Sequence, residues 1–268
     1  MPIPSKEKNE IKKRIINILN IEEKSERLTK EYYEGDRSPF LTELFSDKNL
    51  IVHKILISLS TTMGMSFYEQ VCKLLSEYYG NQCITQEKIQ GIKSASVSKY
   101  LTTLEVKGYV PDRDNELNQI KSLCQKEIKE TKGKNIEYDD DTVDVYIVNP
   151  KGEETLIDIT TVKPNKKEFI TLVKKLRVWS AQRLSQDTNA KINAYIGIPY
   201  NPFSKGDIEG IKYDKWSNYY DRKDILVGTE LWNKVSNNNV TVSDLSEIFA
   251  SIGETMKKKI EQQISSIK

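Results

Sequence analysis

The chain has 268 residues, with 41 Lys and Arg against 39 Asp and Glu, so its net charge at neutral pH is only +2. This length suffices for one large domain or two closely packed lobes, and a polyanionic partner would have to be met by local basic patches. The charged N-terminus and the lack of a long apolar run favour a cytoplasmic protein without a signal peptide or membrane span.

Cysteine and histidine usage narrows the chemistry further. Cys72, Cys83 and Cys124 are odd in number and lack CxxC spacing, which argues against a disulfide framework or a zinc site. His53 is the only histidine, so any site that needs two histidines is excluded. Metallopeptidases of the HExxH type are therefore ruled out.

The spacing of apolar residues along the sequence changes near residue 135. Before it, apolar residues recur at helical spacing, and after it come short β-branched runs separated by turn residues. We therefore expect an α/β protein with a mainly helical lobe at 1–134 and an α/β half at 135–268, packed as one unit. The two clearest helical stripes are Ile11, Ile15, Ile16, Leu19 and Ile21, and Ile51, Ile55, Leu56 and Leu59.

The second half opens with a predicted β-hairpin. TVDVYIV at 142–148 and EETLIDIT at 153–160 read as strands, and the NPKG between them supplies the turn residues of a three-residue loop. This loop pairs Asn149 with Glu153, so paired residue numbers sum to 302 along the ladder. Asp144 is then expected directly opposite Asp158.

Two opposed carboxylates favour a bound cation. Directly opposed side chains on a hairpin have Cβ atoms about 4.5–5.5 Å apart, where like charges repel. Mg²⁺ suits such a pair because it takes oxygen ligands, using one or two carboxylates with water and phosphate oxygens. The alternative is a solvated acidic hairpin, although both aspartates have apolar neighbours along the chain.

VDVYIVNPKGEETLIDITTVKPN resembles the core hairpin of PD-(D/E)XK nucleases, which have a central mixed β-sheet flanked by helices. LISLSTTMGMSFYEQV, TVKPNKKEF and AYIGIPYNPF, in this order, are similar to type II restriction endonucleases of the TdeIII kind, and the resemblance covers about residues 40–230. It implies a Mg²⁺-dependent enzyme, with Mn²⁺ as a substitute, that cleaves double-stranded DNA. Asp144 and Asp158 match the metal-binding pair, to which the Ile159 carbonyl would add a ligand. Glu69 matches an additional acidic residue, or is an ordinary solvent-facing helix residue.

The sequence departs from the family pattern at Thr160, where a lysine is expected two residues after the second acidic residue. Alternate side chains of a strand share a face, so Thr160 lies where that lysine should be. Lys163 has the wrong parity unless the chain bulges or turns before Pro164. Lys163 is the predicted replacement that orients the attacking water; the competing hypothesis is a slow or inactive enzyme.

The segment after the hairpin fits phosphate binding. Asn165 and Glu168 form a capping-box pattern that opens a helix, and Lys166 and Lys167 lie at its N-terminus. Lys174 and Lys175, further along this helix, read as a solvated face. After the strand KINAYIGIP, a loop presents further candidate DNA contacts. These are Tyr200, Asn201 and Lys205.

An alternative function comes from ITQEKIQGIKSASVSKYLTTLEVKGYV, which resembles the helix-turn-helix of winged-helix DNA-binding regulators without nuclease activity. The restriction-enzyme resemblance implies instead a short, palindromic, GC-rich target of the GGNCC type and a DNA methyltransferase in the same system. Palindromic targets favour a homodimer. Replacing either aspartate by alanine is expected to abolish cleavage and to leave metal-free stability level or higher, because opposed like charges destabilise a hairpin.

Overall fold

The computed structural model describes residues 3–35, 37–91, 94–104, 109–130, 142–160, 163–210 and 212–265. Two compact units make up the chain, Met1–Val71 with Ser243–Lys268, and Cys72–Val242. The expected division at 134/135 thus differs from this one and falls inside the second unit. Among the described residues no single helix is long and apolar enough to cross a membrane, although Asp47–Thr62 and Ser66–Tyr78 meet that test as a bent pair.

The first unit is helical, and both predicted stripes lie on its helices. Ile11, Ile15 and Leu19 are buried on one helix, which ends where Asn20 takes a left-handed conformation with φ 45°. The second stripe is only partly buried, because Leu56 is 57% exposed. The helices are α1 Ser5–Leu19, α2 Ile21–Glu34, α3 Pro39–Leu44, α4 Asp47–Thr62, the start of α5 Met65–Tyr78, and most of α10 Val242–Ser265.

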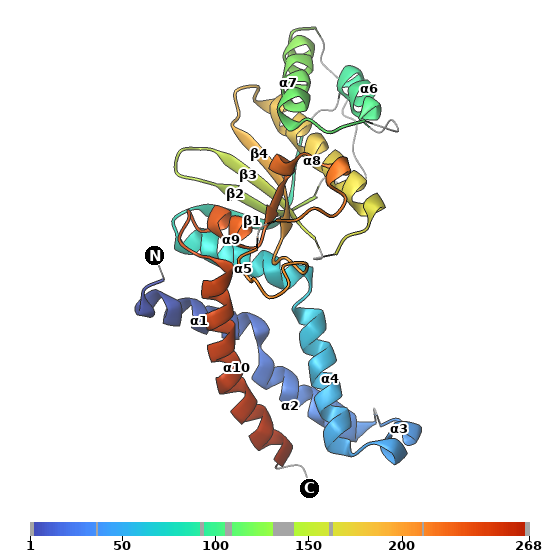
Figure 1. Ribbon diagram of the computed structural model, residues 1–268, viewed down its shortest axis with the longest axis vertical. Coiled ribbons are helices and arrows are strands. Elements are labelled where there is room, and N and C mark those ends of the chain that lie inside the picture. Colours follow the sequence, from blue (N-terminus) through green and yellow to red (C-terminus); the bar gives the residue numbers. More distant parts are fainter. Residues whose placement is uncertain are drawn as a thin grey trace. The chain divides into compact units, whose positions relative to one another are not determined.

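The second unit is built on a five-stranded mixed sheet (Figure 1). Its strands lie side by side in chain order: β1 Gln82–Lys88, β2 Thr142–Val148, β3 Glu154–Ile159, β4 Ile192–Ile198 and β5 Ile225–Val227. β2 runs antiparallel to both of its neighbours, β1 and β3, whereas β3, β4 and β5 run parallel to one another. The helices are α6 Ala95–Thr103, α7 Arg113–Glu130, α8 Lys166–Gln186 and α9 Thr229–Val235. The predicted α/β class with a central mixed sheet flanked by helices is confirmed.

β1 corrects one sequence interpretation. The segment read as the start of a helix-turn-helix contains Ile84–Lys88, which belongs to this strand and pairs with β2. Only α6 of the proposed recognition segment is described as a helix. A strand built into the central sheet is not available as the first helix of a winged-helix reader, so the structure does not support that alternative.

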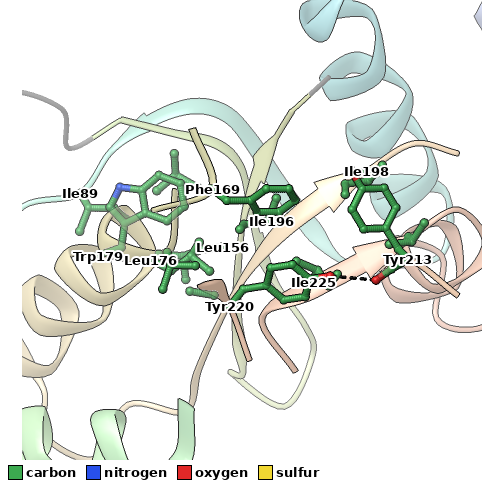
Figure 2. Close-up of a cluster of buried hydrophobic side chains, with 14 residues drawn as sticks. Ile89, Leu156, Phe169, Leu176, Trp179, Ile196, Ile198, Tyr213, Tyr220 and Ile225 are labelled. Atoms are coloured by element: carbon green, nitrogen blue, oxygen red, sulfur yellow. Dashed lines mark hydrogen bonds between the residues drawn. The ribbon is translucent and has the colours of Figure 1, made fainter. Parts of the chain in front are cut away.

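The core of the second unit lies between α8 and the sheet. Figure 2 shows Phe169, Leu176 and Trp179 of α8 beside strand residues such as Leu156 and Ile196. These five side chains are fully buried. The apolar face of α8 is therefore the face that packs on the sheet. Two tyrosines of the segment before β5 complete the cluster, and the hydroxyl of Tyr220 donates to the Tyr213 carbonyl at 2.8 Å.

A buried ionic network holds the other side of α8. The Arg177 side chain is 1% exposed and donates two parallel hydrogen bonds of 2.7 Å to the carboxylate of Asp224. Its Nε donates to Glu116 of α7, whose other oxygen accepts from the Tyr109 hydroxyl at 2.7 Å. These acceptors raise the pKa of Arg177 against the opposing effect of burial. α7, α8 and the approach to β5 are thus joined by Arg177, and Arg113 of α7 adds a second cation, whose Nε lies 3.9 Å from Asp224 Oδ1.

Candidate active site

The β2–β3 hairpin has the predicted register. Four pairs from Val145–Ile157 to Val148–Glu154 have residue numbers that sum to 302. The backbone N–H of Asn149 donates to the backbone carbonyl of Glu153 at 3.1 Å, and Gly152 takes φ 74°, as the three-residue loop requires. Continued by one step, this register sets Asp144 opposite Asp158.

The two strands part at this point. No backbone pair follows Val145–Ile157 among the described residues of β2 and β3, although β2 stays paired with β1 and β3 with β4. The half-buried Asp144 carboxylate spans the opening and accepts from the backbone N–H of Ile159 at 2.8 Å. On the other side, the amide of Gln86 donates to it at 3.2 Å. Gln86 itself has φ 56°, an unusual conformation for a non-glycine residue within a strand.

The Asp158 carboxylate forms an ion pair that the sequence did not reveal. The ammonium nitrogen of Lys175, on α8, lies 2.6 Å from Asp158 Oδ2, and the two side chains are 16% and 7% exposed. The same nitrogen lies 5.0 Å from the centre of the Trp179 ring. The prediction that Lys175 belongs to a solvated face is therefore wrong. Lys174, its neighbour, is exposed as expected.

A second ion pair repeats this arrangement further along the same helix and strand. Arg183 Nη2 lies 2.7 Å from Glu154 Oε1, and Glu154 also accepts from the Tyr146 hydroxyl at 2.8 Å. Burial alone would raise the pKa of Glu154, but the hydrogen bonds from Arg183 and Tyr146 outweigh it and lower that pKa below its ordinary value. Burial, together with the hydrogen bond to Glu154, raises the pKa of Tyr146 to about 12.

Lys163, the predicted replacement for the missing lysine, is exposed, and its ammonium lies 5.8 Å from the centre of the Phe203 ring. Within the described part of the chain, no ion pair joins Lys163 to a carboxylate. Thr160 is half-buried, and its N–H continues the β3–β4 ladder to the Gly197 carbonyl at 3.0 Å. The structure therefore brings Lys175, rather than Lys163, to Asp158.

Glu69 lies on α5 in the first unit and is 6% exposed. The interpretation of Glu69 as an ordinary solvent-facing residue is therefore wrong. A buried carboxylate needs a compensating partner. Its proposed role beside the aspartates stays a prediction.

The donor set at the hairpin suits a hard divalent cation. Asp144 and Asp158 flank the point where β2 and β3 part, and Asp158 is already balanced by a positive charge from the protein. Among the described residues no group of three or more His, Cys, Asp or Glu side chains could hold a metal. Mg²⁺ needs no such group, since it is commonly bound by one or two carboxylates with water and phosphate oxygens.

The residues predicted to contact DNA differ in their exposure. Asn165 caps α8 in a complete capping box with Glu168, as expected, and Lys166 and Lys167 are exposed at this helix end. Tyr200 is 43% exposed. Asn201 is 6% exposed, and its amide donates to the carbonyls of residues 210 and 212 within the loop. Asn201 therefore holds the loop together, which corrects the expectation that it contacts DNA.

Lys205 lines an open cleft of about 590 Å³ in the same loop region. Lys215, which lines the cleft, lies 5.6 Å from the Phe203 ring centre, and Lys166, at the start of α8, lies 4.4 Å from that of Tyr219. The cleft is lined by Asn201, Phe203, Ser204, Lys205, Asp207, Gly210, Lys212, Asp214 and Lys215. Positive charges and rings thus occur together on the loops that follow β3 and β4.

Comparison with known proteins identifies the chain's relatives. It is 27% identical over 208 residues to the type II restriction enzyme MjaII of Methanocaldococcus jannaschii, a match that covers 73% of this chain and 53% of MjaII. It is 22% identical over 240 residues to the type II restriction enzyme HgiEI of Herpetosiphon aurantiacus, covering 86% and 82%. This chain thus spans about half of MjaII. No solved structure matches it significantly. The family model described as type II restriction endonuclease, HinfI, matches residues 3–253. The chain therefore belongs to the HinfI family of type II restriction endonucleases.

Proposed function

We propose that this protein is a Mg²⁺-dependent type II restriction endonuclease that hydrolyses double-stranded DNA at a short palindromic site. The observation that carries the proposal is the pair of aspartates at the parting of β2 and β3, in a chain of this family. The pair also supports membership of the PD-(D/E)XK superfamily and a resemblance to restriction enzymes of the TdeIII kind.

Asp144, Asp158 and the Ile159 carbonyl would hold Mg²⁺, for which Mn²⁺ substitutes. When bound, the cation lowers the pKa of a bound water and stabilises negative charge developing on the phosphate. The protein orients its own ligands: the Ile159 N–H and the Gln86 amide fix the Asp144 carboxylate. Glu69 is proposed to hold a second ion or its water shell.

DNA contacts are proposed for the loops after β3 and β4. Lys166, Lys167 and the N–H groups at the start of α8 suit a backbone phosphate. Tyr200 is exposed and Lys205 lines the cleft, which makes both available to the DNA backbone or to base edges. Phosphate contacts fix position, whereas base-edge contacts would read the sequence, proposed to be GC-rich and of the GGNCC type.

A homodimer is proposed because a palindrome presents two equivalent half-sites. The first unit exposes large apolar side chains on α3 and α4, with Phe40 82%, Leu44 72%, Leu56 57% and Ile57 53% exposed. Exposed apolar residues gathered on neighbouring helices are typical of protein interfaces. Analytical ultracentrifugation should give a dimer, and Phe40→Asp with Leu44→Asp should shift it toward the monomer.

The test of function is digestion of unmethylated plasmid DNA with the purified protein and Mg²⁺, followed by sequencing of the ends. Discrete fragments with identical end sequences are expected, and EDTA should stop their formation. DNA modified by the methyltransferase expected in the same system should resist. Asp144→Ala and Asp158→Ala should bind the site in Ca²⁺ without cutting. Cleavage by either variant at the wild-type rate would contradict the metal-pair assignment.

A further inference from the structure

We propose that Lys175 of α8 supplies the ammonium group of the active site, in place of the strand lysine replaced by Thr160. The inference rests on the proposed nuclease function. Its basis is the ion pair of 2.6 Å between Lys175 and Asp158, with only 16% of the lysine side chain exposed. Lysine loses considerable rotamer freedom when held this way, so its fixed position needs strong compensating contacts. The Trp179 ring, 5.0 Å away, provides a second one.

The crossover from β3 to β4 explains how a helix can deliver this group. Because β3 and β4 are parallel and α8 connects them, α8 must run back along β3 in the opposite direction. Four residues of helix advance about 6.0 Å, and two residues of strand advance about 6.6 Å. One stripe of α8 therefore keeps step with one face of β3. Two ion pairs follow this match, Lys175 with Asp158 and Arg183 with Glu154, and Trp179 between them belongs to the same buried core cluster as Leu156.

The same geometry assigns the ammonium a position within the site. Asp158 is the residue after which the family pattern expects the lysine, and Lys175 reaches that carboxylate from the face of the sheet that α8 covers. Without a divalent cation, Lys175 balances the buried charge of Asp158. Its four-carbon stem lets the ammonium turn from the carboxylate to an adjacent water or phosphate oxygen once substrate is present. Lys175 then orients the attacking water by donating hydrogen bonds to it.

The first experiment compares Lys175→Met with two controls. Lys174→Met removes a neighbouring exposed lysine, and Arg183→Met breaks an ion pair of similar length and burial on the same helix. Lys175→Met should lower the single-turnover cleavage rate by roughly 10²–10⁴, the scale of a lost acid–base or water-positioning contact, with DNA affinity in Ca²⁺ little changed. Both controls should keep most of the rate, although Arg183→Met should also lower the melting temperature. Equal slowing by Arg183→Met and Lys175→Met would assign Lys175 a structural role and overturn the proposal.

The second experiment returns the lysine to the strand. Thr160→Lys in the Lys175→Met background should recover at least about tenfold in rate, because it restores an ammonium two residues after Asp158. Lack of any recovery contradicts the proposal. So does a slow Lys163→Ala variant beside a fast Lys175→Met variant, which would make Lys163 the ammonium donor.

Binding of Mn²⁺ measured by calorimetry gives a readout that needs no cleavage. Lys175→Met should bind Mn²⁺ more tightly than the wild type, since the competing ammonium is gone from Asp158, and Lys174→Met should not. Unchanged or weaker binding overturns the inference. If the wild-type protein cuts no DNA but Lys175→Met still tightens Mn²⁺ binding, the proposed function fails while the placement of the ammonium at the cation site stands.

Discussion

Replacing Asp158 by asparagine tests the charge balance of the site in the absence of metal. The sequence alone led us to expect level or higher stability, because two opposed carboxylates repel. The structure changes this expectation for Asp158, whose carboxylate lies 2.6 Å from the Lys175 ammonium and is 7% exposed. Asp158→Asn therefore leaves an ammonium that has lost its counterion.

The magnitude follows from the environment of the pair. Removing one partner of a fully buried ion pair costs about 3–5 kcal/mol. Lys175 is 16% exposed and can turn toward water, and relief of repulsion with Asp144 returns about 0.2–1 kcal/mol, so we expect a net loss of about 1–3 kcal/mol. For a unit of this size, that corresponds to roughly 2–12 °C in melting temperature. Asp144→Asn keeps an oxygen acceptor for the Ile159 N–H, so its change should stay within about 1 kcal/mol.

Thermal and urea unfolding in EDTA, followed by circular dichroism, measures both variants beside the wild type. Cleavage in Mg²⁺ should be lost in both, so the two substitutions are matched in activity and differ only in stability. An Asp158→Asn protein that melts at or above the wild-type temperature would refute the reasoning. So would a larger loss in Asp144→Asn than in Asp158→Asn.

Three further outcomes are expected. Arg177→Met should lower the unfolding free energy by about 3–5 kcal/mol, measured by urea titration, because Glu116 loses its 2.5 Å ion pair and Asp224 keeps only Arg113, at 3.9 Å. The lowered pKa of Glu154 contributes stability above the unfolded-state pKa of about 4.3, and that contribution is lost as the pH falls; Glu154→Gln should therefore show a flatter loss of melting temperature between about pH 5 and 3. Gln86→Gly should change stability by less than about 1 kcal/mol, since glycine tolerates φ 56°. It should nevertheless slow cleavage by roughly tenfold or more, because Asp144 loses a charge-assisted hydrogen bond.

The features that the sequence predicted correctly are governed by neighbours in the chain. The hairpin register follows from the residues of one three-residue loop, and the start of α8 follows from the Asn165–Glu168 capping box. The sequence does not predict β1 as a strand, because four of its seven residues are Gln, Glu or Lys and because its partner strand begins more than fifty residues later. Thus the predicted helical lobe was extended through a segment that in fact contributes to the sheet.

The contact between the Lys175 ammonium and Asp158 could not be predicted from the sequence for a different reason. Parity along β3 counts against Lys163, which is nevertheless the replacement that the sequence predicts, whereas Lys175 is seventeen residues beyond Asp158. Its proximity depends on the direction of the β3–β4 crossover and on which face of α8 packs on the sheet. Neither is encoded in the spacing of charged residues, and an adjacent lysine, Lys174, has the same local chemistry but faces outward.

The matched advance of α8 and β3 bears on how such sites can be recognised and how they change. A search that requires a lysine at a fixed interval from the second aspartate would pass over a chain in which a helix brings the lysine to that aspartate. Because the α8 stripe and the β3 face keep step between two ion pairs, a lysine at position 160 and one at position 175 address the same row of the sheet. An ancestral protein carrying both could lose either without an inactive intermediate. By contrast, one residue inserted in α8 before Lys175 would turn the stripe by about 100° and remove both ion pairs at once.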